Sequence, residues 1–146
     1  MLASNTFAQR PNVDTLSING IMTTMPSNSV PALSKFDTMF WNPTLGVGML
    51  RKDDRYYNHK GEYRVGVQNA NIEQVTFAIG AKNKEEAIKI FNDVAAQLKS
   101  NFGEPDNSVT VGDLEIRWEG VKQFFALRMA PSNNAVNIIL SKFDQK

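Results

Sequence analysis

Apolar residues along this chain recur with two different periods, one typical of helices and one typical of strands. Between residues 83 and 105 the helical spacing is carried by Ala87, Ile88, Phe91, Val94, Ala95, Leu98 and Phe102. Residues at this spacing share one face of an α-helix. Asn83 can cap the start by accepting from a first-turn amide, and Gly103 followed by Pro105 ends the helix. The pattern predicts one amphipathic helix with a buried face.

A second helical period runs from residue 27 to residue 40. It is carried by Val30, Leu33, Phe36, Met39 and Phe40. Pro31 fits only the first turn of such a helix, and Asn42-Pro43 ends it. We therefore expect a second helix before the first long strand.

The rest of the chain alternates apolar and polar residues, which predicts half-buried antiparallel strands. The alternating segments are residues 16–21 (a short strand that turns at Asn19-Gly20), 45–49, 63–67, 75–79, 114–118, 125–129 and 136–140. The polar stretch between residues 52 and 61 separates two of these strands, so we expect a long hairpin with a charged, aromatic tip.

The two halves of the chain share the order helix, strand, strand, strand, and a constant shift of 62 residues superimposes part of them. The shift carries Phe36 to Leu98, Phe40 to Phe102, Pro43 to Pro105, Tyr63 to Phe125, Val65 to Leu127 and Val67 to Met129. The strand at 114–118 falls opposite the polar loop around Asp53, and the final strand is displaced by one residue. The alternative is two unrelated strand meanders packed together.

These observations predict an α+β fold: a tandem α-β-β-β repeat whose antiparallel sheet carries both helices on one face. We expect residues 1–12 to be a flexible N-terminus and residues 13–146 to be a single domain, with repeats at about 15–80 and 83–143. The opposite, open face would present Gly46, Gly48, Arg64, Gly66, Gln68, Thr76, Ala78, Glu115, Arg117, Phe124, Ala126, Arg128, Asn137 and Ile139. The glycines would flatten that face in the first half.

Composition narrows the classes of function. The 146 residues carry a net charge of +1, so no overall field attracts nucleic acid, and there is no cysteine for disulfide or thiolate chemistry. No apolar run is long enough to span a bilayer, so we expect no stable membrane insertion. Thr6-Phe7-Ala8 before Gln9 resembles the end of a trimmed secretory signal, which suggests a periplasmic or secreted protein; the alternative is an ordinary terminus of a cytoplasmic one.

No residue pattern indicates a catalytic, cofactor or metal site. His59 is the sole histidine, so no multi-histidine metal motif exists. Gly46-Val47-Gly48 lies inside a strand pattern and is not followed by a helix, which argues against a nucleotide-binding loop. The carboxylate pairs Glu115 with Glu119 and Asp53 with Asp54 could in principle serve acid–base catalysis, but we expect them to be solvated. We expect no catalytic residue, no cofactor and no metal.

The hairpin tip and the open face are the candidate sites for a partner. Tyrosine beside arginine is the composition of protein-binding hot spots, and it could also stack single-stranded nucleic acid. The alternative is that Tyr63 is core and that Tyr56 and Tyr57 cover the sheet edge. The predicted partner-binding residues are Arg51, Arg55, Tyr56, Tyr57, His59, Arg64, Gln68, Arg117, Phe124 and Arg128.

Two short motifs add a resemblance. The segment Ile18-Asn19-Gly20-Ile21 followed by Met25, and the helix ending Phe102-Gly103-Glu104-Pro105, resemble the small bacterial envelope domains of the beta-lactamase-inhibitor-protein-like and outer-membrane-assembly-lipoprotein-like superfold. The glycine that usually precedes the methionine is Thr24 here, and the lipid-accepting cysteine is absent. The resemblance implies a binder or inhibitor without shared catalytic residues.

The expected function is therefore a noncatalytic protein-binding domain, inhibitor- or immunity-protein-like, which uses the open face and the 51–61 hairpin loop to bind another protein. The first alternative is a ligand-binding or assembly-factor domain of a bacterial envelope complex. The second is an enzyme of unrecognised type.

Overall fold

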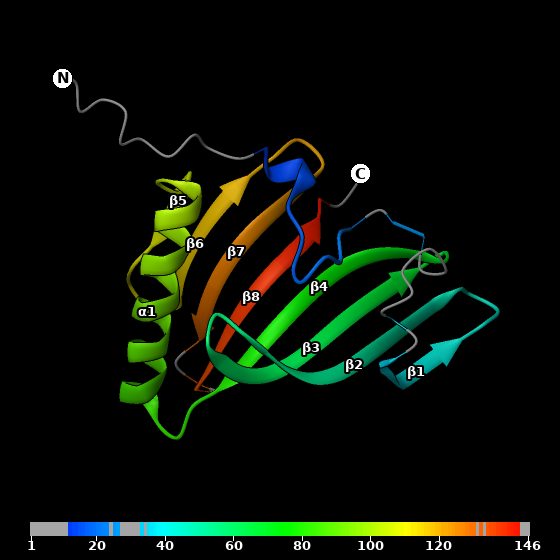
Figure 1. The fold of residues 1–146 in the computed structure, drawn as a ribbon, viewed down its shortest axis with the longest axis horizontal. Coiled ribbons are helices and arrows are strands. Elements are labelled where there is room, and N and C mark those ends of the chain that lie inside the picture. Colours follow the sequence, from blue (N-terminus) through cyan, green and yellow to red (C-terminus); the bar gives the residue numbers. More distant parts are fainter. Residues whose placement is uncertain are drawn as a thin grey trace.

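One eight-stranded antiparallel sheet forms most of the molecule (Figure 1). The computed structural model describes residues 12–23, 25, 26, 33, 35–130, 132 and 134–143. The strands are β1 (Asp37–Asn42), β2 (Val47–Tyr56), β3 (His59–Gln68), β4 (Asn71–Gly80), β5 (Asn107–Val109), β6 (Leu114–Glu119), β7 (Gln123–Ala130) and β8 (Ala135–Lys142). Their order in the sheet is β1-β2-β3-β4-β8-β7-β6-β5, so two four-stranded meanders join where β4 pairs with β8.

Tight turns connect the strands of the first meander. Tyr57 and Asn58 join β2 to β3, and Asn69 and Ala70 join β3 to β4; all four have positive φ. Two consecutive residues with positive φ give a turn whose twist matches that of the flanking strands. The predicted loop at 51–61 is therefore mostly strand, since only two residues separate β2 from β3.

The helix predicted from residue 83 is confirmed as α1 (Lys84–Phe102). The Asn83 side chain accepts from the Glu86 amide at 2.8 Å, and Gly103 leaves the helix with φ of 79°. Its buried residues are Ala87, Ile90, Phe91, Val94, Ala95 and Leu98, and the helix packs against β7 and β8. The Phe102 ring meets Trp118 and Phe125 edge-on, which closes the helix end onto the sheet.

The prediction of two helices on one face is wrong: α1 is the one α-helix among the described residues. Part of the expected helix at 27–40 lies outside those residues, and its last four residues belong to strand β1, which pairs with β2. Phe40 and Trp41 are residue types that favour strands, and pairing satisfies backbone groups that β2 would otherwise leave at an edge. Each half of the sheet therefore has four strands instead of three.

Residues 12–23, 25 and 26 form an irregular segment, here called the N-terminal strap, on the same side of the sheet as α1. The short strand predicted at residues 16–21 is not formed; one isolated β-bridge pairs Ile18 with Ile21. The Asp14 carboxylate accepts from the amides of Val121, Lys122 and Gln123 at 3.1, 2.8 and 3.2 Å. Figure 1 shows the strap, in blue, at the end of the sheet where β6 turns into β7.

The side chain of Gln123, which is 1% exposed, also binds the strap. Its Nε2 donates to the carbonyls of Val13 at 2.7 Å and Leu16 at 3.2 Å, and its Oε1 accepts from the Thr23 hydroxyl. At the other end of the strap the Ile72 amide donates to the Met25 carbonyl at 2.9 Å. The strap thus runs from β7 to β4 and covers apolar side chains of both meanders.

The register explains why the predicted repeat slips by one residue in its last strand. Tyr63, Val65 and Val67 pair with Phe77, Val75 and Ile72, as Phe125, Leu127 and Met129 pair with Leu140, Ile138 and Val136. All twelve of these side chains are buried. The β3–β4 pairing shifts between Gly66 and Val67, which leaves Glu73 as an extra residue in β4, while the β7–β8 turn is two residues longer than the β3–β4 turn. Together these differences displace the second half by one position.

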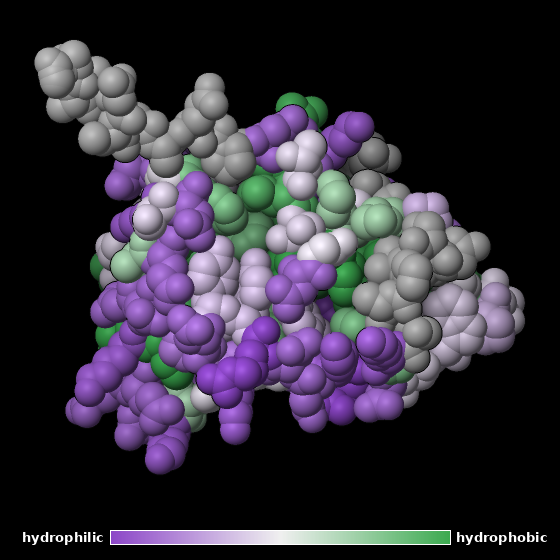
Figure 2. Space-filling view, in the orientation of Figure 1, coloured by the Kyte–Doolittle hydropathy of each residue, from purple (hydrophilic) through white to green (hydrophobic). Residues whose placement is uncertain are grey.

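The covered side of the sheet is shown in Figure 2. Hydrophilic residues of α1 and of the β2–β3 hairpin border a central area where hydrophobic residues are visible. The core beneath is continuous across both meanders, and its largest fully buried side chains include Trp118, Tyr63, Phe77 and Phe125.

Candidate functional site

The face of the sheet opposite α1 and the strap carries most of the predicted partner-binding residues. Residues paired directly across strands share a face, so the register defines this open face. Its three central rows are Asp53, Glu62, Ala78, Asn137, Arg128 and Glu115; Asp37, Arg51, Arg64, Thr76, Ile139, Ala126 and Arg117; and Phe40, Met49, Gly66, Gln74, Ser141, Phe124 and Glu119. No described helix and no part of the strap crosses this face.

Two residues predicted for the open face do not belong to it. Gly46 lies in the β1–β2 turn, with φ of 63°. Gly48 pairs with Val67, so it faces the core, and a Cβ there would overlap the ring of Trp41. Of the three predicted glycines only Gly66 lies on the open face, and a Cβ there would have ordinary contacts with Gln74 and Met49.

Ion pairs hold the first-half end of the open face. Arg51 donates to Glu62 from Nε at 3.0 Å and from Nη2 at 2.8 Å, and it also contacts Asp53 at 2.5 Å. Arg64 donates to the other oxygen of Glu62 at 2.7 Å. The hydrogen bonds from Arg51 and Arg64 hold the pKa of Glu62 below its usual range. Glu62 therefore stays ionised at neutral pH, which suits a structural ion pair and not a general acid.

A second cluster of ion pairs lies at the other end of the open face, on strands β6 and β7. Arg128 donates to Glu115 from Nη2 at 2.6 Å and from Nε at 2.8 Å. Arg117 pairs with the same carboxylate at 3.4 Å and places its guanidinium 4.1 Å from the centre of the Phe124 ring. An arginine stacked on an aromatic ring is held in one orientation, so the cluster is preorganised.

A shallow apolar floor lies between the two charged clusters. Ala126 is fully buried and Ile139 is 7% exposed although both point to the open face, because larger side chains stand around them. The small Ala78 and the polar Thr76 and Asn137 lie beside it and are half-buried. The face thus combines a small buried apolar floor with ion-paired arginines at both ends.

The hairpin tip, predicted as a free binding loop, packs back onto α1. The Tyr57 hydroxyl accepts from Asn101 at 3.2 Å, and His59 Nε2 lies 2.9 Å from Asp93. Tyr56 packs its ring 5.7 Å from that of Phe77, and burial, together with the charge of neighbouring Tyr57, raises the pKa of its hydroxyl. The tip side chains therefore tie the first meander to the helix of the second.

The structure separates the predicted partner-binding residues into groups. Arg51, Arg64, Gln68, Arg117, Phe124 and Arg128 lie on the open face. Tyr56, Tyr57 and His59 lie against the core and α1. Arg55 lies beyond the ion-pair cluster, where Nη2 donates to the Asn58 carbonyl at 3.4 Å.

Sequence reasoning missed the outer edge of β1. Met39, Phe40, Trp41 and Leu45 are between 47% and 62% exposed, and they form the largest group of exposed apolar side chains near one strand among the described residues. Phe40 pairs with Met49 and so extends the open face to this edge. The adjacent Phe-Trp pair, which favours a strand, was the signal that could have revealed it.

Among the described ranges, no group of three or more His, Asp or Glu residues is placed to hold a metal ion. In the same part of the chain, no helix combines the length and apolar character needed to cross a membrane. No family model matches the chain, and neither the curated proteins nor the solved structures include one that is detectably similar to it.

Proposed function

We propose that this chain is a noncatalytic protein-binding domain, inhibitor-like in action, that binds another protein with the open face of its sheet. The observation that carries the proposal is the buried apolar floor of Ala126 and Ile139 between two arginine clusters. Protein interfaces commonly have an apolar centre, and aromatic and arginine side chains contribute most of their binding energy.

The preorganised clusters favour binding by reducing its entropic cost. Arg117, Arg128 and Phe124 are already held by Glu115 and by ring stacking, so little side-chain freedom remains to be lost. The proposal uses the open face without the tip tyrosines, since these residues are engaged with α1 and the core.

Affinity capture from an extract of the source cells, followed by mass spectrometry, tests the proposal. The protein is immobilised through its C-terminus and compared with two variants. Arg128→Ala removes one open-face arginine, and Lys89→Ala removes an exposed cation from α1 as the matched control. Hot-spot truncations cost about 2 kcal/mol or more, so Arg128→Ala should weaken binding of the captured protein about 30-fold while Lys89→Ala leaves it unchanged.

Circular dichroism of both variants checks that they keep the sheet. Equal binding by the wild type and Arg128→Ala, with a loss in the α1 variant, would assign the interaction to the helix side and contradict the proposal. The identity of the captured protein then separates inhibition of a target from a role in envelope assembly.

A further inference from the structure

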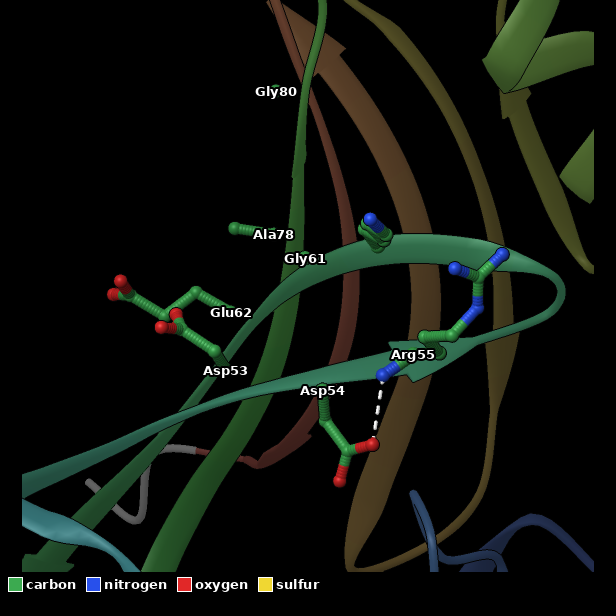
Figure 3. Close-up of a pocket in the computed structure, with 8 residues that line it drawn as sticks. Asp53, Asp54, Arg55, Gly61, Glu62, Ala78 and Gly80 are labelled. Atoms are coloured by element: carbon green, nitrogen blue, oxygen red, sulfur yellow. Dashed lines mark hydrogen bonds between the residues drawn. The ribbon is translucent and has the colours of Figure 1, made fainter.

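A pocket of about 570 Å³ opens beside the β2–β3 hairpin and β4 (Figure 3). Three carboxylates, two cations and the small residues Gly61, Ala78 and Gly80 line it. Figure 3 shows Asp53 and Glu62 projecting to the same side from neighbouring strands, with Arg55 further along β2 towards the turn. The pocket lies at one margin of the open face and shares Asp53, Glu62 and Ala78 with it, but the function proposed above does not use Arg55 or Lys60.

Each carboxylate of the pocket already has a cationic partner. Asp53 contacts Arg51 at 2.5 Å, and Glu62 binds both Arg51 and Arg64. Asp54 accepts from the Arg55 amide at 2.8 Å and from Lys52 at 3.1 Å, and these contacts, the amide first, hold its pKa below the usual range. The acidic side of the pocket is therefore satisfied without a ligand.

Among the described residues, the two cations have no such partner. Arg55 and Lys60 sit directly opposite each other in the β2–β3 register. The guanidinium of Arg55 makes a single long contact, 3.4 Å to the Asn58 carbonyl, and no described carboxylate lies within 4.0 Å of either side chain. Like charges directly across a strand pair repel and destabilise it. An anion between them would remove that repulsion.

The small residues leave room for such an anion. A Cβ added to Gly80 would meet nothing within 4 Å, and Ala78 contributes only a methyl group. Gly61 cannot be larger, because a Cβ there would overlap the Ala78 carbonyl. The β2–β3 hairpin thus passes close to β4 at Gly61, while the space next to Gly80 stays open.

We infer that this pocket binds a small oxyanion, a phosphate group or a dicarboxylate, between Arg55 and Lys60. Arginine offers a planar fork of donors and lysine a point charge, and both bind anionic oxygens well. The test of the inference is separate from that of the open-face proposal, since Arg128 and Phe124 do not line this pocket.

Amide NMR titration with inorganic phosphate and, separately, with succinate tests the inference, with sodium chloride used to hold ionic strength constant. We expect saturable shifts at the amides of Arg55, Lys60, Gly61 and Gly80. Arg55→Gln and Lys60→Gln should each weaken binding about tenfold, which corresponds to loss of one charge-assisted contact. Gly80→Leu should weaken it by filling the space, while Lys89→Gln on α1 should leave it unchanged.

The stronger of the two probes identifies the source of the oxyanion as phosphoryl or carboxylate. Shifts that do not saturate, or that persist equally in Arg55→Gln and Lys60→Gln, would show nonspecific ion binding and overturn the inference.

A second variant keeps the test valid if the glutamine variants fold poorly. Lys60→Glu replaces a repelling pair by an attracting one, so its Tm in chloride should exceed that of the wild type. Phosphate or succinate should then raise the Tm of the wild type but not of Lys60→Glu. An equal rise in both proteins would contradict an oxyanion held between these two side chains.

Discussion

The two meanders of the sheet pair their strands in the same way but are covered by different kinds of structure. The second meander is covered by α1, whose nineteen residues bury six apolar side chains against β7 and β8. The first meander is covered by three separate segments. These are the end of the strap, Phe36, which packs against Tyr63, and the tip of the β2–β3 hairpin. A sheet face must be kept from water, but the element that covers it need not be regular.

The two coverings also differ in what holds them. The α1 face is apolar, so its docking depends on burial and packing. The strap buries only Val13, Ile18 and Ile21 among its apolar side chains, and hydrogen bonds of Asp14 and Gln123 to backbone groups fix its position. The comparison predicts that the helix dominates global stability, whereas the strap responds to pH and opens locally.

The largest expected effect comes from truncating the α1 face. Leu98 is fully buried, so Leu98→Ala leaves a cavity and should lower the free energy of unfolding by about 3 kcal/mol. Ile88→Ala, at a half-buried position of the same helix, is the matched control and should cost clearly less. Urea denaturation followed by circular dichroism measures both, and equal losses would show that the helix face does not dominate.

A smaller effect is expected from releasing the strap. Asp14→Ala removes the acceptor of three amides and should cost about 1–2 kcal/mol. Hydrogen exchange should increase at Val121, Lys122 and Gln123 while the amides of α1 keep their protection. Asp113→Ala, an exposed position in the loop before β6, is the control. Uniform exchange through α1 would mean that the two coverings open together.

The smallest expected effect is a pH dependence of the stability that the strap contributes through Asp14. The amide of Lys122, assisted by those of Val121 and Gln123, holds the pKa of Asp14 below its ordinary value of 3.8. A carboxylate with a depressed folded pKa stabilises the protein above its unfolded pKa, and this contribution is lost as pH falls through the folded value. The stability difference between wild type and Asp14→Asn should therefore shrink below about pH 4. A constant difference down to pH 2 would contradict this account.

Local chemistry made parts of the fold predictable. The capped amphipathic stripe of α1 and the alternation in most strands depend on neighbours a few residues away, and the structure confirms them. The segment at 37–40 was misjudged because the spacing from Phe36 to Phe40 fits a helix, although only Phe40 belongs to strand β1. Pairing with β2 decided between them.

In the candidate site, too, local patterns predicted some residues correctly, while others depended on contacts distant in sequence. Alternation alone assigned Arg64, Arg117, Phe124 and Arg128 to the open face, and the register agrees. Tyr57 and His59 were predicted at a free tip, since nothing near them in sequence indicates Asn101 and Asp93 as partners. The pocket between Arg55 and Lys60 also depends on Gly80, which lies on a different strand.

The sequence by itself determined which side chains of most strands turn towards the core, where α1 begins and ends, and that the chain has no cysteine chemistry. The tertiary structure alone decided that β4 pairs with β8, that a strap covers what a second helix was expected to cover, and that the hairpin tip folds back onto α1. The physical reason is range: periodicity and capping act over a few residues, whereas these contacts join residues tens of positions apart.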